Sequence, residues 1–185
     1  MNLQRSLEAY KCKMASTLSK ELLEVLSRNT SLLQERNLAE QAITLGDSFP
    51  AFSLPDSQAN IYSLTGLLAK GPIIISFFRG GWCPYCVLEL KALRDIVDDL
   101  PTLNATLIAI TPEAPQHVAD TVSRNELNFI VVSDQGNQLA KQCGLVFTVP
   151  DQLLSEYQKL GIDISANNGE ARAELPIPAT YIVDQ

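Results

Sequence analysis

Apolar residues recur every three or four positions through the first part of the chain. This spacing, from Asn2 to about Leu26, is typical of one face of an amphipathic helix. Ser31, followed three residues later by Gln34, has the form of a capping box and predicts a second, shorter helix that reaches about Ile43. The apolar stripe has two interpretations: it packs against the rest of the chain, or it forms a homodimer through the N-terminal helices.

After Leu45 the pattern changes to short apolar runs that alternate with helical stretches. Strands that alternate with helices of this length favour an α/β fold with a central, partly parallel sheet. We therefore divide the chain into an N-terminal helical extension, residues 1–43, and a main domain, residues 44–185. The expected strands are Ile73–Phe78, Ala105–Thr111 and Phe129–Ser133. The expected helices are Cys83 to about Leu100, Pro115–Asn125 and Gln138–Cys143. Pro101 stops the first of these helices, and Gly144 ends the last.

The last third of the chain is less regular. "LLSEYQKL" can be helical, whereas "SANNGEARAE" is polar and predicts an exposed excursion. "PIPATYIVD", Pro176 to Asp184, ends like a strand, and the sequence stops at Gln185. Because a sheet rarely ends on an uncovered strand, we expect that the domain lacks its last strand and helix or receives them from a partner chain.

Composition and charge narrow the classes of function. The 185 residues carry a net charge of -7, which opposes the phosphate neutralisation that nucleic-acid binding depends on. The apolar block Ile73–Phe78 is far shorter than the roughly 20 residues of a membrane helix. No leader peptide is recognisable, so we expect a cytoplasmic protein that binds neither nucleic acid nor membrane.

The chemistry-bearing feature is "RGGWCPYC", in which Cys83 and Cys86 stand between a strand and a helix. Unpaired N–H groups at a helix start stabilise a thiolate, Pro84 suits the first helical position, and Arg79 is the nearest cation able to stabilise either thiolate. A metal site would need about four ligands, and the other candidates are scattered singly, so no metal and no cofactor is expected. Dithiol–disulfide redox chemistry explains the pair better than a structural pair does.

Several segments resemble the peroxiredoxins, the alkyl hydroperoxide reductase and thiol-specific antioxidant group of the thioredoxin superfamily. They are "GDSFPAFSLPD", "IIISFF", "CVLELKAL", "FIVVSDQGNQLAKQCGL" and "ATYIVD", within a match of roughly Leu45 to Gln185. The resemblance implies a thioredoxin-like fold with a central mixed sheet flanked by helices. It also implies an antioxidant oxidoreductase in which Cys86, followed by Glu89, occupies the peroxidatic position.

The chain departs from that family at two peroxide-activating positions. Cys83 stands where the family has a threonine, and no arginine precedes the strand that contains Tyr181. Strong peroxidase activity is therefore not expected. The motif "WCPYC" instead resembles thioredoxin and glutaredoxin, which implies that Cys83 is the attacking thiol, that Pro178 is a cis-proline facing the disulfide, and that Trp82, Tyr85 and Pro178 contact the substrate or partner.

Two functional hypotheses remain open. In the first, Cys83 and Cys86 cycle between dithiol and disulfide to reduce a hydroperoxide or a protein disulfide, with electrons from a thioredoxin-, glutaredoxin- or glutathione-type thiol. In the second, the pair is a redox sensor whose disulfide state switches packing or dimerisation. Which of the two thiols attacks also remains open at this point.

Overall fold

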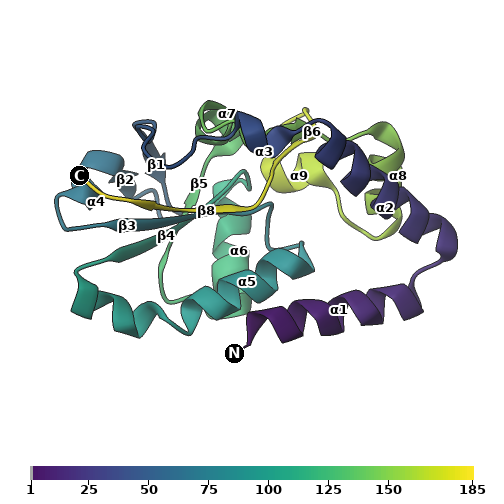
Figure 1. Cartoon of the computed structure of the whole chain (residues 1–185), viewed down its shortest axis with the longest axis horizontal. Coiled ribbons are helices and arrows are strands. Elements are labelled where there is room, and N and C mark those ends of the chain that lie inside the picture. The colour runs from purple at the N-terminus through teal and green to yellow at the C-terminus, as the bar shows by residue number, and fades with distance from the viewer. Residues whose placement is uncertain (1) are drawn as a thin grey trace.

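A four-stranded mixed sheet forms the centre of the molecule in a computed structural model that describes residues 2–185 (Figure 1). Strands β3, β4 and β5 are parallel, and β8 pairs antiparallel with β3 at one edge. The predicted α/β fold with a mixed sheet is confirmed. The order in the sheet is β5 (Ile130–Ser133), β4 (Thr106–Thr111), β3 (Ile73–Phe77) and β8 (Ala179–Val183); two smaller sheets pair β1 (Ser53–Pro55) with β2 (Ile61–Ser63) and β6 (Val146–Thr148) with β7 (Glu174–Pro176).

Helices cover both faces of the central sheet. Alternate side chains of a strand point to opposite faces, so Ile108 and Ile110 enter one core cluster while Ala109 enters the other. The first cluster lies under α4 (Leu64–Leu68) and α7 (Gln138–Gln142), and the second lies under α5 (Pro84–Arg94) and α6 (Pro115–Asn125). Cys83 and Cys86 belong to the second cluster, so the thiols are part of the packing between α5 and the sheet.

The helix that was expected to run from Cys83 to about Leu100 is shorter than predicted. α5 ends at Arg94, and a 3-10 helix, η1 (Val97–Leu103), follows it with Pro101 inside. Val97 and Leu100 face inward three residues apart, a spacing that fits a 3-10 helix as well as an α-helix. The apolar pattern alone therefore could not reveal the change of winding.

The N-terminal helices break at other positions than predicted, and the first predicted helix, Asn2 to about Leu26, is interrupted. α1 (Leu3–Thr17) and α2 (Lys20–Glu35) are separated at Leu18 and Ser19, and the Ser19 hydroxyl accepts a hydrogen bond from the Leu22 N–H at 3.2 Å. The predicted capping box is also wrong, since Ser31 lies inside α2. A short α3 (Leu38–Gln41) follows. The 3–4 spacing of apolar residues continues across Ser19, which is why the break was missed.

The apolar stripe of these helices faces the rest of the same chain. α1 runs beside α5, and α2 packs on α8 (Asp151–Lys159), as Figure 1 shows. Val25, Leu26 and Leu33 of α2 contact a core cluster that includes Leu153 of α8. Packing within the chain is thus confirmed. The homodimer through these helices stays a prediction.

The C-terminal third is more ordered than its polar sequence suggested. The helix expected at "LLSEYQKL" is present as α8, and β8 confirms the strand-like end. The expected exposed excursion, residues 165–174, is wrong in part, because it begins within α9 (Ile164–Asn168) and Asn168 is buried. Among the described residues, no helix is long and apolar enough to cross a membrane. The boundary at residue 44 and the lacking strand and helix stay predictions.

Candidate active site

The dithiol motif lies where β3, in the middle of the sheet, leads into α5. Cys83 is the N-cap residue of α5, Pro84 occupies the first turn, and Cys86 follows in that same turn. Both cysteines are free thiols, and their residues are only 2% and 1% exposed. The positive end of the helix dipole therefore acts on two buried sulfur atoms.

Arg79 provides the positive charge at the motif. Its Nη2 donates a hydrogen bond to Cys83 Sγ at 3.0 Å, and its guanidinium carbon lies 6.0 Å from the centre of the Trp82 ring. The guanidinium is charged at every physiological pH, so this contact favours a thiolate at Cys83. Arg79 thus lies within hydrogen-bond reach of the motif, as the predicted role in thiolate stabilisation requires.

The pKa values of the two thiols are shifted in opposite directions. A hydrogen bond from the Cys86 thiol lowers the pKa of Cys83 to about 6; burial opposes this shift, and the charge of Arg79 reinforces it. The pKa of Cys86 is raised, because its thiol donates to Cys83 and because burial and the Cys83 charge disfavour a second thiolate. These shifts, with the Arg79 contact, favour a Cys83 thiolate beside a protonated Cys86 at neutral pH.

Trp82 and Tyr85 lie on different sides of the motif. The Trp82 ring packs against Tyr157 of α8, with ring centres 5.6 Å apart. Tyr85 is 38% exposed, and Tyr10 of α1 meets it edge to face with ring centres 5.0 Å apart. Trp82 is therefore held by the body of the molecule, whereas Tyr85 is in contact with the N-terminal helix.

Pro178 lies at the same end of the sheet as the motif. It immediately precedes β8, in which Ala179 pairs with Phe77, the last residue of β3. The expectation of a cis-proline is wrong, since no peptide bond among residues 2–185 is cis. The chain passes from β7 directly into β8 and Ile177 donates to the Leu145 carbonyl at 2.8 Å, so the tight turn in which cis-prolines usually occur is absent there.

Glu113 is a site residue that sequence reasoning missed. It is 2% exposed, and its Oε1 accepts a hydrogen bond from the Gly81 N–H at 3.0 Å while its Oε2 accepts one from the Thr121 hydroxyl at 3.0 Å. Burial raises the pKa of Glu113 to about 7. The carboxyl group therefore fixes the backbone that leads into Trp82 and Cys83. Its place just beyond a buried parallel strand was the available signal, because such strand ends meet at one edge of the sheet.

The two glycines before Trp82 allow this close packing. Gly80 has a φ of 151°, and a Cβ there would lie 2.4 Å from Trp82 Nε1. A Cβ on Gly81 would lie 2.1 Å from Thr121 Oγ1. Side chains at these positions would push the motif away from Glu113 and α6.

The remaining thiols and the histidine lie outside this arrangement. Cys143 is buried, and burial raises its pKa to about 12, so it is an unreactive thiol. Cys12 is exposed on α1. His117 lies in the first turn of α6, with Nδ1 4.0 Å from an Asp120 carboxylate oxygen. Within residues 2–185, no group of three or more His, Cys, Asp or Glu residues is placed to hold a metal ion.

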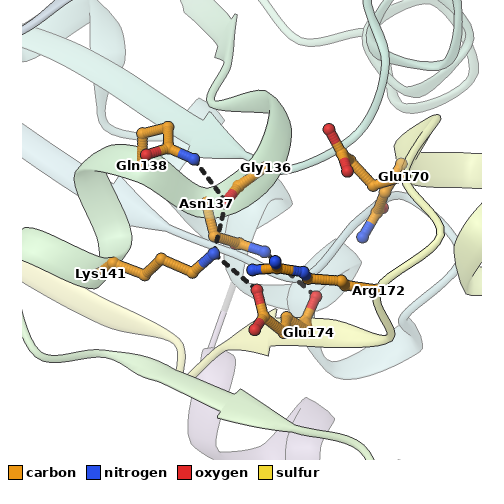
Figure 2. Close-up of a pocket in the computed structure, with 8 residues that line it drawn as sticks. Gly136, Asn137, Gln138, Lys141, Glu170, Arg172 and Glu174 are labelled. Atoms are coloured by element: carbon orange, nitrogen blue, oxygen red, sulfur yellow. Dashed lines mark hydrogen bonds and ion pairs between the residues drawn. The ribbon is translucent and has the colours of Figure 1, made fainter.

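A polar cavity of about 280 Å³ lies away from the motif, between α7, α9 and β7 (Figure 2). Lys141 Nζ forms an ion pair with a Glu174 oxygen at 2.7 Å and donates to the Gly136 carbonyl at 3.0 Å. None of its lining residues is a cysteine. The charges of Lys141 and Glu174 are engaged with each other, and the cavity brings no thiol chemistry to the redox pair.

The chain belongs to the AhpC/TSA family, whose family model matches residues 45–185. Two bacterial relatives have names that include "peroxiredoxin bcp". The Haemophilus influenzae protein is 32% identical over 103 residues, 56% of this chain and 66% of its own, and the Escherichia coli protein is 28% identical over 100 residues, 54% of this chain and 64% of its own. The chain therefore matches slightly less than two thirds of the length of each relative.

A solved structure supports the fold. Peroxidoxin BcpB from Mycobacterium tuberculosis superposes with a TM-score of 0.59 at 21% identity, covering 75% of this chain and 77% of that one. The thioredoxin-like architecture expected from the sequence is confirmed.

Proposed function

We propose that this protein is a thiol-dependent oxidoreductase of the peroxiredoxin type, in which Cys83 attacks the substrate and Cys86 resolves the product. The observation that carries the proposal is the 3.0 Å contact of Arg79 Nη2 with Cys83 Sγ. The pKa of this same thiol, Cys83, is lowered to about 6. The thiolate is the nucleophile in such chemistry, and Cys86 keeps its proton. This assigns the attack to the first cysteine rather than to the position that the family resemblance implied.

With a hydroperoxide ROOH, the Cys83 thiolate attacks the terminal oxygen and breaks the O–O bond. Cys83 becomes a sulfenic acid, and the leaving alkoxide takes up a proton to become an alcohol. The Cys86 sulfur then attacks the Cys83 sulfur, a Cys83–Cys86 disulfide forms, and water leaves with the hydroxyl of the sulfenic acid and the Cys86 proton. Two electrons have passed from the dithiol to the peroxide.

With a disulfide substrate, the same thiolate attacks one sulfur and releases the other as a thiolate. Cys86, after losing its proton, attacks Cys83 in the mixed disulfide and releases the second substrate thiolate. A thioredoxin-, glutaredoxin- or glutathione-type thiol returns two electrons to the Cys83–Cys86 disulfide. A compartment that keeps thiols reduced, such as the cytoplasm, suits this cycle.

We expect this protein to reduce peroxides more slowly than is usual for its family. Cleavage of an O–O bond gains most from fixed donors aimed at the charge that develops on the leaving oxygen. Cys83 replaces the threonine donor, and Arg79 already donates to the thiolate through Nη2. Arg79 Nε is buried without a hydrogen-bond partner among the described residues, so its N–H is a donor that a peroxide oxygen could use.

The experiment compares wild type with Cys83→Ser, Cys86→Ser and the control Cys12→Ser. Consumption of hydrogen peroxide and reduction of a protein disulfide are measured with a dithiol reductant in excess. We expect Cys83→Ser to be inactive and Cys12→Ser to match wild type. Cys86→Ser, when it is treated with the substrate and no reductant, should accumulate a Cys83 sulfenic acid or mixed disulfide. Full activity of both single variants of the motif would refute the proposal. One round of oxidation without turnover in wild type would favour a redox sensor instead.

A further inference from the structure

The reactive thiolate is nearly inaccessible in the folded molecule. The Cys83 residue is 2% exposed and Cys86 is 1% exposed, although a substrate sulfur or oxygen must come into direct contact with Cys83 Sγ. A hydroperoxide presents a two-atom group and can enter through a narrow gap. A disulfide in a folded protein is surrounded by its own chain and needs open surface around the thiolate.

Helix α1 covers the motif at Tyr85. Tyr10 of α1 meets the Tyr85 ring edge to face at 5.0 Å between ring centres. The half-buried side chains on this side of α1 are Leu3, Leu7, Tyr10 and Met14, and contacts between α1 and α5 are the main ones that α1 makes with the domain. Burial is the main cause that raises the pKa of Tyr10, and the negative charge of the Cys83 thiolate adds to it, which agrees with a place near the thiolate.

The attachment of α1 is weak compared with that of α2. α1 has no buried residue, whereas α2 buries Leu22 and Asn29 and contributes to a core cluster. Leu18 and Ser19 separate the two helices, and the Leu18 backbone is extended with ψ at 155°. An element with few buried apolar contacts opens at low free-energy cost, so α1 can move while α2 stays in place.

We propose that α1 is a lid that selects substrates by size, with Tyr10 as the residue that closes it against Tyr85. In the closed position small hydroperoxides reach Cys83 through side-chain motion alone. Disulfides of folded proteins reach Cys83 only after α1 swings about Leu18 and Ser19. This inference rests on the proposed function, since it assigns different accessibility to the two substrate classes of the same thiolate.

The test uses the full chain in a Cys12→Ser background, so that the exposed thiol of α1 does not react. Tyr10→Ala is compared with Tyr10→Phe, which keeps the ring, and with Lys11→Ala, an exposed position on the same helix. Each variant is reacted with hydrogen peroxide, with the disulfides of insulin, with iodoacetamide and with a maleimide carrying a polyethylene glycol chain. Circular dichroism confirms that every variant is folded.

Loss of the aromatic contact should favour the open lid by about five-fold. We therefore expect Tyr10→Ala to react about five-fold faster with insulin and with the bulky maleimide, and within about two-fold of wild type with hydrogen peroxide and iodoacetamide. Tyr10→Phe and Lys11→Ala should match the parent.

Equal acceleration with small and bulky reagents, or none with either, would overturn the lid. The maleimide readout does not depend on turnover. If neither substrate turns over in the parent while maleimide labelling still responds to Tyr10→Ala, the proposed function fails and the lid stands.

Discussion

At the scale of single residues, the two cysteines of the motif are not equivalent. The negative charge is favoured on Cys83, and the proton is favoured on Cys86. Arg79 and the Cys86 thiol both favour a thiolate at Cys83, and their combined effect outweighs the burial that opposes it. Burial and the Cys83 charge act together on Cys86 and raise its pKa. The asymmetry therefore comes from Arg79 and the hydrogen bond between the thiols, and not from a difference in exposure.

Glu113 leads to a prediction about stability and pH. Its pKa in the folded protein is about 7, above its ordinary value of 4.5, so the protonated carboxyl group is the form that suits the folded state. Its contribution to stability is fully present below about pH 4.5 and is lost as pH rises through about 7. The side chain of Glu113→Gln stays neutral at every pH. From pH 5 to pH 8, the free energy of unfolding of this variant should therefore rise by up to about 3 kcal/mol relative to that of wild type.

Urea unfolding of wild type and Glu113→Gln at pH 5 and pH 8, both fully reduced, measures this difference. Cys83 titrates in the same interval with the opposite sign, since a lowered thiol pKa contributes stability that is lost as pH falls through about 6. That contribution is present in both proteins and cancels. A difference in unfolding free energy that does not change with pH would contradict the assignment to Glu113.

Part of this site could be predicted from the sequence. The spacing of Cys83 and Cys86 and the position of Arg79 identified the redox pair, because all three lie within one strand-to-helix junction. Glu113 could not be found from local sequence, because it reaches Gly81 across 32 positions of the chain. The geometry of Pro178 was predicted wrongly, because the path from β7 into β8 depends on pairing between distant segments.

At the scale of elements, the strands and the helices between them followed the apolar pattern closely. α6 runs from Pro115 to Asn125 as predicted, since Pro115 begins the helix and Glu126, with a φ of 52°, ends it. The errors fall where the same spacing fits two structures, as at the break between α1 and α2 and in the 3-10 helix η1. Apolar periodicity shows which side chains face inward, but it does not show where the backbone changes course.

The unequal attachment of α1 and α2 predicts unequal sensitivity to substitution. Leu22 of α2 is buried, so Leu22→Ala should lower the free energy of unfolding by about 2 to 4 kcal/mol. Leu7 of α1 is only half-buried, so Leu7→Ala should cost about 1 kcal/mol or less. Chemical denaturation of both variants measures this, and a larger loss for Leu7→Ala would show that α1 is held as firmly as α2.

At the scale of the whole molecule, the sheet, the two core clusters and the N-terminal helices act together on the thiolate. The central sheet places the motif at the same end as Pro178, and Glu113 binds the backbone before the motif. The cluster under α5 buries both sulfur atoms, and α1 covers Tyr85. Oxidation to the Cys83–Cys86 disulfide would remove the thiolate charge that Arg79 faces. The redox state therefore changes the charge at the point where the central sheet, α5, α1 and the segment that carries Glu113 come together.

The central claim is that Cys83 is the thiolate and Cys86 the protonated partner, and alkylation of the reduced protein tests it most directly. The rate of reaction with iodoacetamide is measured from pH 4 to pH 10 in Cys12→Ser protein, and mass spectrometry locates the modified cysteine. The account predicts modification of Cys83 with a midpoint near pH 6, and no early modification of Cys86. A midpoint near that of an ordinary thiol, about 8.5, or earlier reaction of Cys86, would contradict it.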